Sequence, residues 1–374
     1  MTTPHTRLSW LMALGLAPLG AIFPYMAKEL RAWGVDGLTL TALMVIMPLT
    51  RVLIGPMWGT LADHWRDEAR VLRFAALTSF FGLIALLSLP ASFAVVGLLL
   101  MIAGRAGIGP VLDGLTLRAL GGDSGAYGKV RRWGSVGFLV AVGVAALLED
   151  QLGLSPLKLG VLLSAAFCAM ALFAPQAEPP PRAPLWPAFK AMLGDPAMRW
   201  LLLGAALHYA PHSIYDTYFT VHVEDLGMRP ALAGVAVALG VAVEVIVLGK
   251  SQAILARFGA ERLFVASALL AIPRWLLTAW ATAPWLVIGL QASHGFTFGA
   301  FWVSAVALVS RRAPAHLTNS AQGLLGAAVG GVGAALGASA GAVLVPYGSA
   351  ALFVLAAIIA VLSLGVQGLA TRAR

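Results

Sequence analysis

The feature that most constrains this chain is a succession of apolar stretches, each about as long as a bilayer is thick. A hydrocarbon core about 30 Å thick needs roughly 20 apolar residues in a helix. With glycine, proline and charge clusters taken as boundaries, the sequence predicts twelve spans, and we expect an all-α integral membrane protein. The spans lie near residues 8–27, 38–61, 71–89, 91–117, 131–148, 158–175, 199–221, 230–250, 263–281, 284–310, 318–345 and 348–369.

Composition agrees with this reading, because 60% of the 374 residues are hydrophobic and only 11% are charged. A soluble chain of this length needs far more polar surface. The single cysteine, Cys168, lies in an apolar segment, so an intrachain disulfide is excluded and a buried thiol is expected.

The placement of basic residues predicts the topology. If both termini are cytoplasmic, eighteen basic residues lie on the cytoplasmic side and four on the other, as the positive-inside rule requires. This asymmetry accounts for the net charge of +9 without a nucleic acid partner. The eighteen are Arg7, Arg66, Arg70, Arg73, Arg118, Lys129, Arg131, Arg132, Arg182, Lys190, Arg199, Lys250, Arg257, Arg262, Arg311, Arg312, Arg372 and Arg374, and the four are Lys28, Arg31, Lys158 and Arg229.

A proline-rich segment at 176–198 divides the chain into six spans plus six. We expect one six-helix bundle over 1–175, a cytoplasmic linker over 176–198 and a second bundle over 199–374. A faint repeat supports the division, since "WGTLADHWRDEARVL" follows the second span and "SQAILARFGAERLFV" follows the eighth. Parallel six-helix repeats are typical of a large class of transporters with a central site between the halves.

The link after the second span contains "GTLAD", Gly59 to Asp63, followed by Arg66 and Arg70. This stretch resembles the loop motif of the major facilitator superfamily. Glycine permits a tight turn and close helix approach, and Asp63 can accept hydrogen bonds at a helix N-terminus or pair with an arginine such as Arg118 or Arg131. We expect a latch that closes the cytoplasmic side, the alternative being a solvated loop charge. Ala256 stands where Asp63 would repeat, so a latch in the second half must be built differently.

Four stretches resemble the phenylpropionate-permease-like group of that superfamily, near the nucleoside–proton and oligosaccharide–proton symporters. They are "GAIFPYMAKELRAWGVDG" at 20–37, "PMWGTLADHW" at 56–65, "YGKVRRWGSVGF" at 127–138 and "HGFTFGAFWVSAVALVSR" at 294–311. The resemblance implies proton-driven uptake of a small organic solute. The chain departs from the group at Trp302, where a histidine is common, and at Arg132, where the group has an uncharged residue.

Polar groups in the seventh span suggest a site, because ionisable side chains at membrane depth are costly unless they are paired or hydrated. His208, His212 and Tyr215 are spaced by four and three residues, so they share one helical face, with Asp216 beside them. The stretch "PHSIYD" also resembles the histidine–tyrosine region of the family. We expect this face to line a cavity, with His212 and Tyr215 binding substrate. The alternative is that each histidine is a structural hydrogen-bond donor.

Two further groups of residues are candidates. Arg105 in the fourth span could bind a carboxylate, and Asp113, two turns later, could carry the coupled proton; Glu244 is a second proton candidate. The alternative for the charged residues is structural ion pairing, for example with Arg51. In the tenth span, His294 matches the family, and Phe298 and Trp302 could stack on a ring or serve only for packing.

We therefore expect a monomeric transporter of the bacterial inner membrane that takes up a small organic solute with protons by alternating access. An aromatic carboxylate is favoured; a nucleoside, sugar or siderophore is the alternative, as is a proton-driven exporter. The stretch "LGKS" at 248–251 lacks the first glycine of a phosphate-binding loop, since Glu244 occupies that position. The sequence predicts neither an enzyme nor a receptor, and no cofactor or metal site.

Overall fold

The computed structural model describes residues 4–32, 37–89, 91–176, 178, 184–229 and 231–372. Every regular element in these ranges is helical, which agrees with the expected all-α fold. Within the described ranges, nine helical stretches are long and apolar enough to cross a membrane. They are His5–Met26, Glu68–Ser88, Val95–Ala119, Ser124–Leu152, Ala231–Gly249, Ala260–Trp280, Pro284–Arg312, Ala315–Tyr347 and Ser349–Arg372.

Helices also occupy the three other expected spans. α2 (Gly37–Trp65) has 29 residues and α8 (Pro196–Asp225) has 30, while α6 (Pro156–Ala171) has only 16. α8 contains His208, His212 and Asp216 before its last turn, which lowers its mean hydropathy although it is long enough to span a bilayer.

The remaining helices of the first half are α1 (Pro4–Ala32), α3 (Glu68–Ser88), α4 (Ala91–Ala119) and α5 (Ser124–Leu152). The second half begins with α7 (Leu185–Gly194), before α8, and continues with α9 (Ala231–Gly249), α10 (Ser251–Phe258), α11 (Ala260–Trp280) and α12 (Pro284–Leu290). It ends with η1 (Gln291–Ser293), η2 (Gly295–Ala300), α13 (Phe301–Arg312), η3 (Ala315–Leu317), α14 (Thr318–Gly326), η4 (Ala327–Gly333), α15 (Ala334–Leu344), η5 (Val345–Tyr347) and α16 (Ser349–Arg372).

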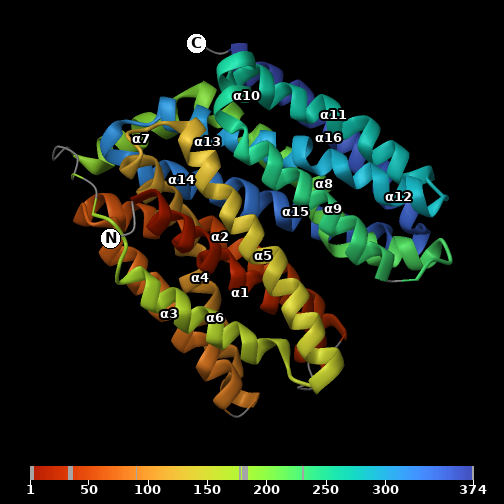
Figure 1. The fold of residues 1–374 in the computed structure, drawn as a ribbon. Coiled ribbons are helices and arrows are strands. Elements are labelled where there is room, and N and C mark those ends of the chain that lie inside the picture. The colour runs from red at the N-terminus through yellow and green to blue at the C-terminus, as the bar shows by residue number, and fades with distance from the viewer. Residues whose placement is uncertain are drawn as a thin grey trace. The chain divides into compact units, whose positions relative to one another are not determined.

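The chain divides into two compact units (Figure 1). Unit 1 contains Met1–Asp123, Val130–Leu185 and Ala315–Gly326, and unit 2 contains Ser124–Lys129, Trp186–Pro314 and Ala327–Arg374. Each unit therefore takes one short segment from the other half of the sequence. Unit 2 holds the first six residues of α5, and unit 1 holds η3 and α14.

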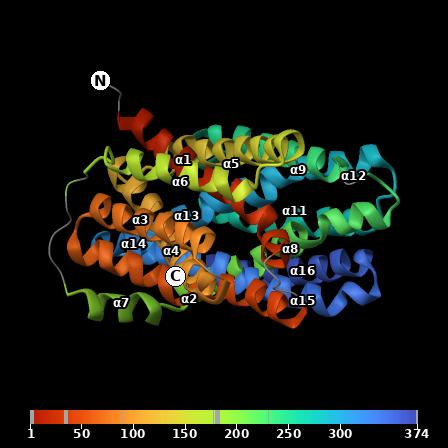
Figure 2. The same ribbon diagram turned by 90° about the horizontal axis from the view of Figure 1, so that it is seen from below.

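The core of unit 1 is built by α3 packing along α4 and α1 packing along α6. Figure 2 shows α3 and α4 side by side. Their contact is close because Gly82 and Gly104 have no Cβ, and a Cβ on either would overlap the backbone of the partner helix. Buried methionines and leucines, including Met26 and Leu83, fill the space around them.

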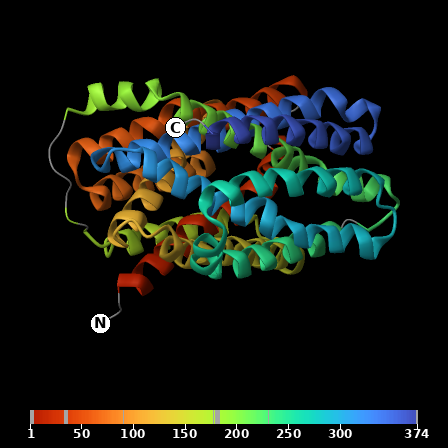
Figure 3. The same ribbon diagram turned by 90° about the horizontal axis from the view of Figure 1, so that it is seen from above.

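Unit 2 is built around α16, which packs against α8 and α11 (Figures 2 and 3). Its core is aromatic: Trp275 is fully buried and stacks on Phe353 with a centroid distance of 6.2 Å, while Phe219 meets Tyr215 at 4.6 Å. Large rings fill volume between helices that carry many small residues, so the rings fix the helix spacing here.

The segment expected as a linker contains a helix. α7 covers ten of its residues, with Trp186 stacked on Phe189 and Lys190 over the Trp186 ring. Most of the proline run, residues 177 and 179–183, lies outside the described residues.

Two helical spans contain π-helical turns. η2 interrupts the tenth expected span and η4 interrupts the eleventh. A π-turn inserts one extra residue into the helical repeat, so side chains before and after it point in different directions from those of a regular α-helix, and such turns are frequent at functional sites.

Candidate functional site

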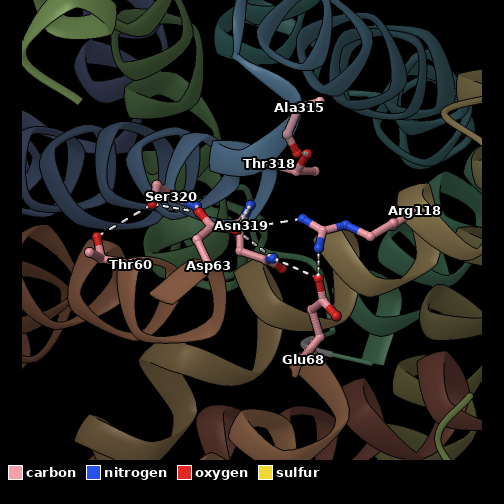
Figure 4. A network of polar contacts seen from close by, with 8 residues as sticks. All are labelled: Thr60, Asp63, Glu68, Arg118, Ala315, Thr318, Asn319 and Ser320. Carbon is pink, nitrogen blue, oxygen red and sulfur yellow. Dashed lines mark hydrogen bonds and ion pairs between the residues drawn. The ribbon is translucent and has the colours of Figure 1, made fainter. Parts of the chain in front are cut away.

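A buried polar cluster surrounds Asp63 at the end of α2, and all of it lies in unit 1. Asp63 is 3% exposed. Its Oδ1 accepts hydrogen bonds from Asn319 N at 3.2 Å and Asn319 Nδ2 at 2.8 Å, and its Oδ2 accepts from Ser320 N at 2.7 Å and Ser320 Oγ at 2.6 Å. Because α14 begins at Thr318, these amides belong to its unsatisfied first turn (Figure 4). Asp63 therefore caps the N-terminus of α14 from a distant part of the chain.

A second carboxylate and one arginine complete this Asp63 cluster. Arg118 Nη2 lies 3.7 Å from Asp63 Oδ1, and Arg118 Nη1 pairs with Glu68 Oε1. Asn319 Nδ2 also reaches Glu68 Oε1 at 3.2 Å (Figure 4). Two negative charges meet one guanidinium, and the positive end of α14 offsets the remaining charge. Burial raises the pKa of the Asp63 carboxyl above its usual value, while the four hydrogen bonds act in the opposite direction.

The backbone around Asp63 differs from the sequence expectation. Gly59 lies inside α2 and not in a tight turn. It is needed for close approach, because a Cβ on Gly59 would overlap the backbone carbonyl of Asn319. The chain turns at Arg66, the one non-glycine residue with a positive φ (58°) in the described part. Asp67 follows and caps α3 by accepting a hydrogen bond from Arg70 N at 2.9 Å.

Of the two arginines expected near Asp63, only Arg118 is among its partners. Arg131 lies on α5, where its Nη1 donates to Ser135 Oγ at 3.4 Å. Glu68, Asn319 and Ser320 were not predicted from the sequence. The run Thr318-Asn319-Ser320 is a typical helix start, but no local pattern indicates which carboxylate caps it.

Unit 2 contains a second buried cluster, centred on Arg274 of α11, which is 2% exposed. Arg274 Nη1 donates to Thr297 Oγ1 at 2.6 Å, and Nη2 donates to Gln291 Oε1 at 3.1 Å. The guanidinium also lies over two rings, 4.1 Å from the Trp275 centroid and 5.0 Å from that of Tyr215. A buried cation is thus held by neutral acceptors and aromatic faces.

Two histidines compete for the same guanidinium. Arg274 Nη1 lies 3.3 Å from His212 Nε2 and 3.4 Å from His294 Nδ1. With Thr297 this gives three acceptors for the two hydrogens on Nη1. Nη1 therefore cannot give each of the three acceptors a hydrogen of its own, and the two histidine contacts are the longer ones.

His294 connects this Arg274 network to Glu244 of α9. His294 Nε2 lies 3.3 Å from Glu244 Oε2, and Glu244 is 3% exposed. Gly295 and Gly299 allow α9 to approach, since a Cβ on Gly295 would contact Val243 and one on Gly299 would contact Glu244. Glu244, the second proton candidate from the sequence, is thus connected to a buried arginine through one imidazole.

The seventh-span stripe has the expected helical spacing, but its members face the interior of unit 2. His208 and His212 are each 1% exposed and Tyr215 is 4% exposed. His208 Nε2 donates to the Thr297 carbonyl at 2.6 Å. His212 Nδ1 donates to the His208 carbonyl at 3.1 Å, which leaves His212 Nε2 as the acceptor for Arg274. The rings of these residues pack against other rings, such as His208 on Phe301 and Tyr215 on Trp275.

Asp216 is separated from this stripe. It is exposed, and it accepts a hydrogen bond from Tyr209 OH at 3.3 Å. It contacts neither His212 nor Tyr215 by a hydrogen bond, so the expected orienting role has no support in the geometry. Tyr209, which was not among the residues predicted from the sequence, is half-buried, and its ring is nearly parallel to that of His212 at 9°.

The tenth-span aromatics form a ladder on one face. His294 stacks on Phe298 at 5.2 Å and Phe298 on Trp302 at 6.2 Å, with interplanar angles of 10° and 16°. Trp302 Nε1 donates to Tyr127 OH at 2.9 Å. Phe298 and Trp302 are each partly exposed, so their ring faces are available for stacking in unit 2.

The candidates on α4 do not meet each other. Arg105 Nη2 donates to the Gly15 carbonyl of α1 at 2.8 Å. Asp113 is 7% exposed and eight residues further on, which is about 12 Å along a helix. Among the described residues no group of three or more histidine, cysteine, aspartate or glutamate side chains could hold a metal ion.

Comparisons with known proteins agree on one class. A family model described as "MFS_1 like family" matches residues 5–356. Maltose permease of Geobacillus stearothermophilus is 28% identical over 327 residues, covering 84% of this chain and 81% of the permease. The probable 3-phenylpropionic acid transporter of Escherichia coli is 28% identical over 194 residues, 50% of each chain. A crystal structure of the E. coli fucose:proton symporter superposes with a TM-score of 0.77 at 14% identity, covering 98% of each chain.

Proposed function

Since the chain belongs to the MFS_1 like family, whose members are membrane transporters and not enzymes, we propose that it carries a small organic solute together with protons by alternating access. In this proposal twelve helices form two six-helix bundles over 1–175 and 199–374, joined by 176–198, with both termini in the cytoplasm of a bacterial cell. The protein acts as a monomer in the inner membrane and imports its solute. The alternative is a proton-driven exporter, in which the same helices and residues move the solute out of the cell.

One observation carries the coupling proposal: His294, which contacts the buried Arg274, also pairs with the carboxylate of Glu244. A proton on His294 would place a second positive charge 3.4 Å from Arg274, which is unfavourable in a low-dielectric interior. Protonation therefore moves Arg274 toward its other acceptors, His212 and Thr297. Because Arg274, His294 and Glu244 lie on α11, at the start of η2 and on α9, the movement is transmitted to three helices.

Asp113 is the rival proton carrier. It is a buried carboxyl in the membrane-spanning part of unit 1. An ionisable side chain at membrane depth costs free energy, so such a group is a functional candidate. The test can separate the two carboxyls, since Glu244 is connected to Arg274 through His294.

The substrate proposal rests on two separate features, ring faces in unit 2 and one cation in unit 1. The partly exposed faces of Phe298, Trp302 and Tyr209 suit a planar ring. Arg105 can bind a carboxylate through donors that the Gly15 carbonyl does not use. We therefore favour an aromatic carboxylate, the class to which 3-phenylpropionic acid, the solute in the name of the E. coli relative, belongs.

A sugar is the second candidate. The relative that aligns with 84% of this chain is named maltose permease, and the exposed carboxylate of Asp216 is an acceptor suited to hydroxyl groups. Sugar rings also stack on aromatic faces, so the ladder alone does not separate the two classes.

Reconstituted vesicles test the proposal. With an imposed inward proton gradient, wild type should accumulate radiolabelled 3-phenylpropionate or maltose, and dissipating the gradient should abolish accumulation. Glu244→Gln should lose accumulation but keep exchange of internal for external solute, which needs no net proton movement. Asp113→Asn is the matched variant, because it removes the carboxyl of the rival proton carrier. If Glu244→Gln still accumulates solute and Asp113→Asn does not, the coupling role belongs to Asp113.

Asp63 has a proposed gating role in this cycle. Its cap on α14 would hold the cytoplasmic side closed, with Gly59 and Arg118 positioning the contact, and would break when that side opens. The fourfold acceptor geometry of Asp63 supports this role.

A further inference from the structure

Asp216 is a carboxylate inside an expected membrane span, and the Arg274 network does not use it. α8 runs from Pro196 to Asp225, which places Asp216 about 30 Å from the start of the helix and about 14 Å from its end. A hydrocarbon core about 30 Å thick therefore includes this carboxylate when the helix is centred in it. The side chain is exposed, and aspartate, unlike lysine or arginine, is too short to reach the interface from that depth. Since an ionised group facing lipid is costly, water or a ligand has to compensate this charge.

The carboxylate of Asp216 forms no ion pair with a base among the described residues. Its one side-chain partner there is Tyr209, whose OH donates to Oδ2 at 3.3 Å. Away from the span ends, the described helices of unit 2 carry three charged side chains, Arg274, Glu244 and Asp216. Arg274 is connected to Glu244 through His294. The negative charge of Asp216 is therefore in excess over the one guanidinium.

The helix that packs on α8 near Asp216 does not supply a base either. Ser213 Oγ and Tyr218 OH donate to backbone carbonyls of α15 at 2.8 and 3.4 Å, so α15 runs along the stretch of α8 that contains Asp216. Between 327 and 347 the sequence has no lysine, arginine or histidine. The carbonyls of this segment are acceptors and cannot neutralise a carboxylate.

Aromatic rings lie next to this carboxylate. Tyr209 is seven residues, or two turns, before Asp216, so the two side chains share one face of α8. The Tyr209 ring is half-buried, and its centroid lies 6.3 Å from that of the partly exposed Phe298. An ammonium group is attracted both to the face of an aromatic ring and to a carboxylate, whereas an anionic group is repelled by Asp216. Rings beside an uncompensated carboxylate therefore suit an organic cation.

We propose that Asp216, with the ring faces of Tyr209 and Phe298, binds the ammonium group of a ring-bearing amine. The proposal rests on the transport function proposed above, since this face of α8 then borders the path of the solute. It differs from a sugar site in the group that the carboxylate recognises. A hydroxyl donates a hydrogen bond but leaves the charge uncompensated, whereas an ammonium group donates and also neutralises. Ring-bearing amines thus join the classes of solute considered above.

Isothermal titration of the purified protein at neutral pH tests the proposal without vesicles or a proton gradient. The ligands are 2-phenylethylammonium, 2-phenylethanol, in which a hydroxyl replaces the ammonium group, and 3-phenylpropionate. Wild type should bind the ammonium ligand roughly tenfold or more tightly than the alcohol. Asp216→Asn should abolish this preference and leave the affinity for 3-phenylpropionate no lower than in wild type. Glu224→Gln, at an exposed carboxylate near the end of the same helix, should keep the preference.

Variants of Tyr209 cover the case in which Asp216→Asn fails to fold. Tyr209→Leu removes the ring face and should weaken binding of the ammonium ligand roughly threefold or more, whereas Tyr209→Phe keeps the ring and should preserve binding. Equal affinities of wild type for the ammonium ligand and the alcohol would assign Asp216 to hydroxyl groups and overturn the proposal, as would an unchanged preference in Asp216→Asn. Failure of wild type to accumulate 3-phenylpropionate or maltose in vesicles, with ammonium binding intact, would count against the proposed function instead.

Discussion

The guanidinium of Arg274 on α11 is a donor to the imidazole of His212 on α8, with 3.3 Å between Nη1 and Nε2. This contact requires a neutral His212, because Nδ1 is already the donor to the His208 carbonyl. The two residues are 62 positions apart and join two helices that α16 also contacts. The position of α8 is therefore sensitive to any change that moves Arg274.

Arg274→Lys should destabilise the protein and uncouple transport. Lysine keeps the charge but cannot donate from two nitrogens at once, so Gln291 or Thr297 loses its partner. Leaving a buried acceptor unsatisfied costs about 1–3 kcal/mol. Thermal unfolding in detergent should show a lower midpoint. Arg257→Lys, on the exposed side of α10, is the control and should leave the midpoint unchanged; equal midpoints for both variants would contradict the assignment.

Asp63→Asn should weaken the Asp63 cluster. An amide presents one acceptor oxygen where the carboxylate presents two, so either Asn319 or Ser320 loses its partner. We expect a loss of about 1–3 kcal/mol in unfolding free energy and slower transport with little change in solute affinity. Asp150→Asn is the control. Wild-type transport rates in Asp63→Asn would remove the gating role.

Arg66→Gly should stabilise the protein. Arg66 has a φ of 58°, a conformation that glycine adopts without steric cost. Relief of this strain is worth about 1 kcal/mol. The melting temperature should rise, whereas Arg132→Gly, inside α5, should lower it by a similar free energy because glycine is a poor helix former. A lower melting temperature for Arg66→Gly would show that the contacts of its side chain outweigh the strain.

Arg105→Gln should discriminate between the two substrate classes. If Arg105 binds a carboxylate, affinity for 3-phenylpropionate should fall at least tenfold, or about 1.4 kcal/mol, while affinity for maltose should change little. Isothermal titration measures both. Arg73→Gln is the matched control, because Arg73 also donates to a backbone carbonyl, that of Ala171 at 3.1 Å. Equal losses for the two solutes would make Arg105 structural.

Much of the fold follows from span length and charge placement, because lipid leaves the backbone few options beyond helices. The sequence also predicts what kind of partner Asp63 has, because a carboxylate accepts hydrogen bonds from a helix N-terminus or from an arginine. Its partners could not be predicted, since Asn319 is 256 positions away and carries no charge.

The contacts within the Arg274 network could not be predicted from the sequence for a different reason. Arg274, His294 and Glu244 stand out as ionisable groups in apolar sequence, but which of them meet depends on helix rotation. η2 adds a residue per turn directly after His294, so an α-helical wheel misplaces the side chains around it. The stripe of His208, His212 and Tyr215 has the right spacing, yet periodicity does not tell whether a polar face meets a cavity or other side chains.

The segment Ala315–Gly326 has a consequence for how the protein is made. Unit 1 includes this segment, which leaves the ribosome well after α6, once most of the second half has been synthesised. Until then Asp63 and Glu68 lack the amides that α14 supplies. Domains usually fold as they are synthesised, N-terminal first, but here the first half has to wait in the membrane in an incomplete form. A nascent chain stopped before residue 315 should therefore be a better substrate for membrane proteases than the finished protein, and supplying the missing helix in trans should protect it.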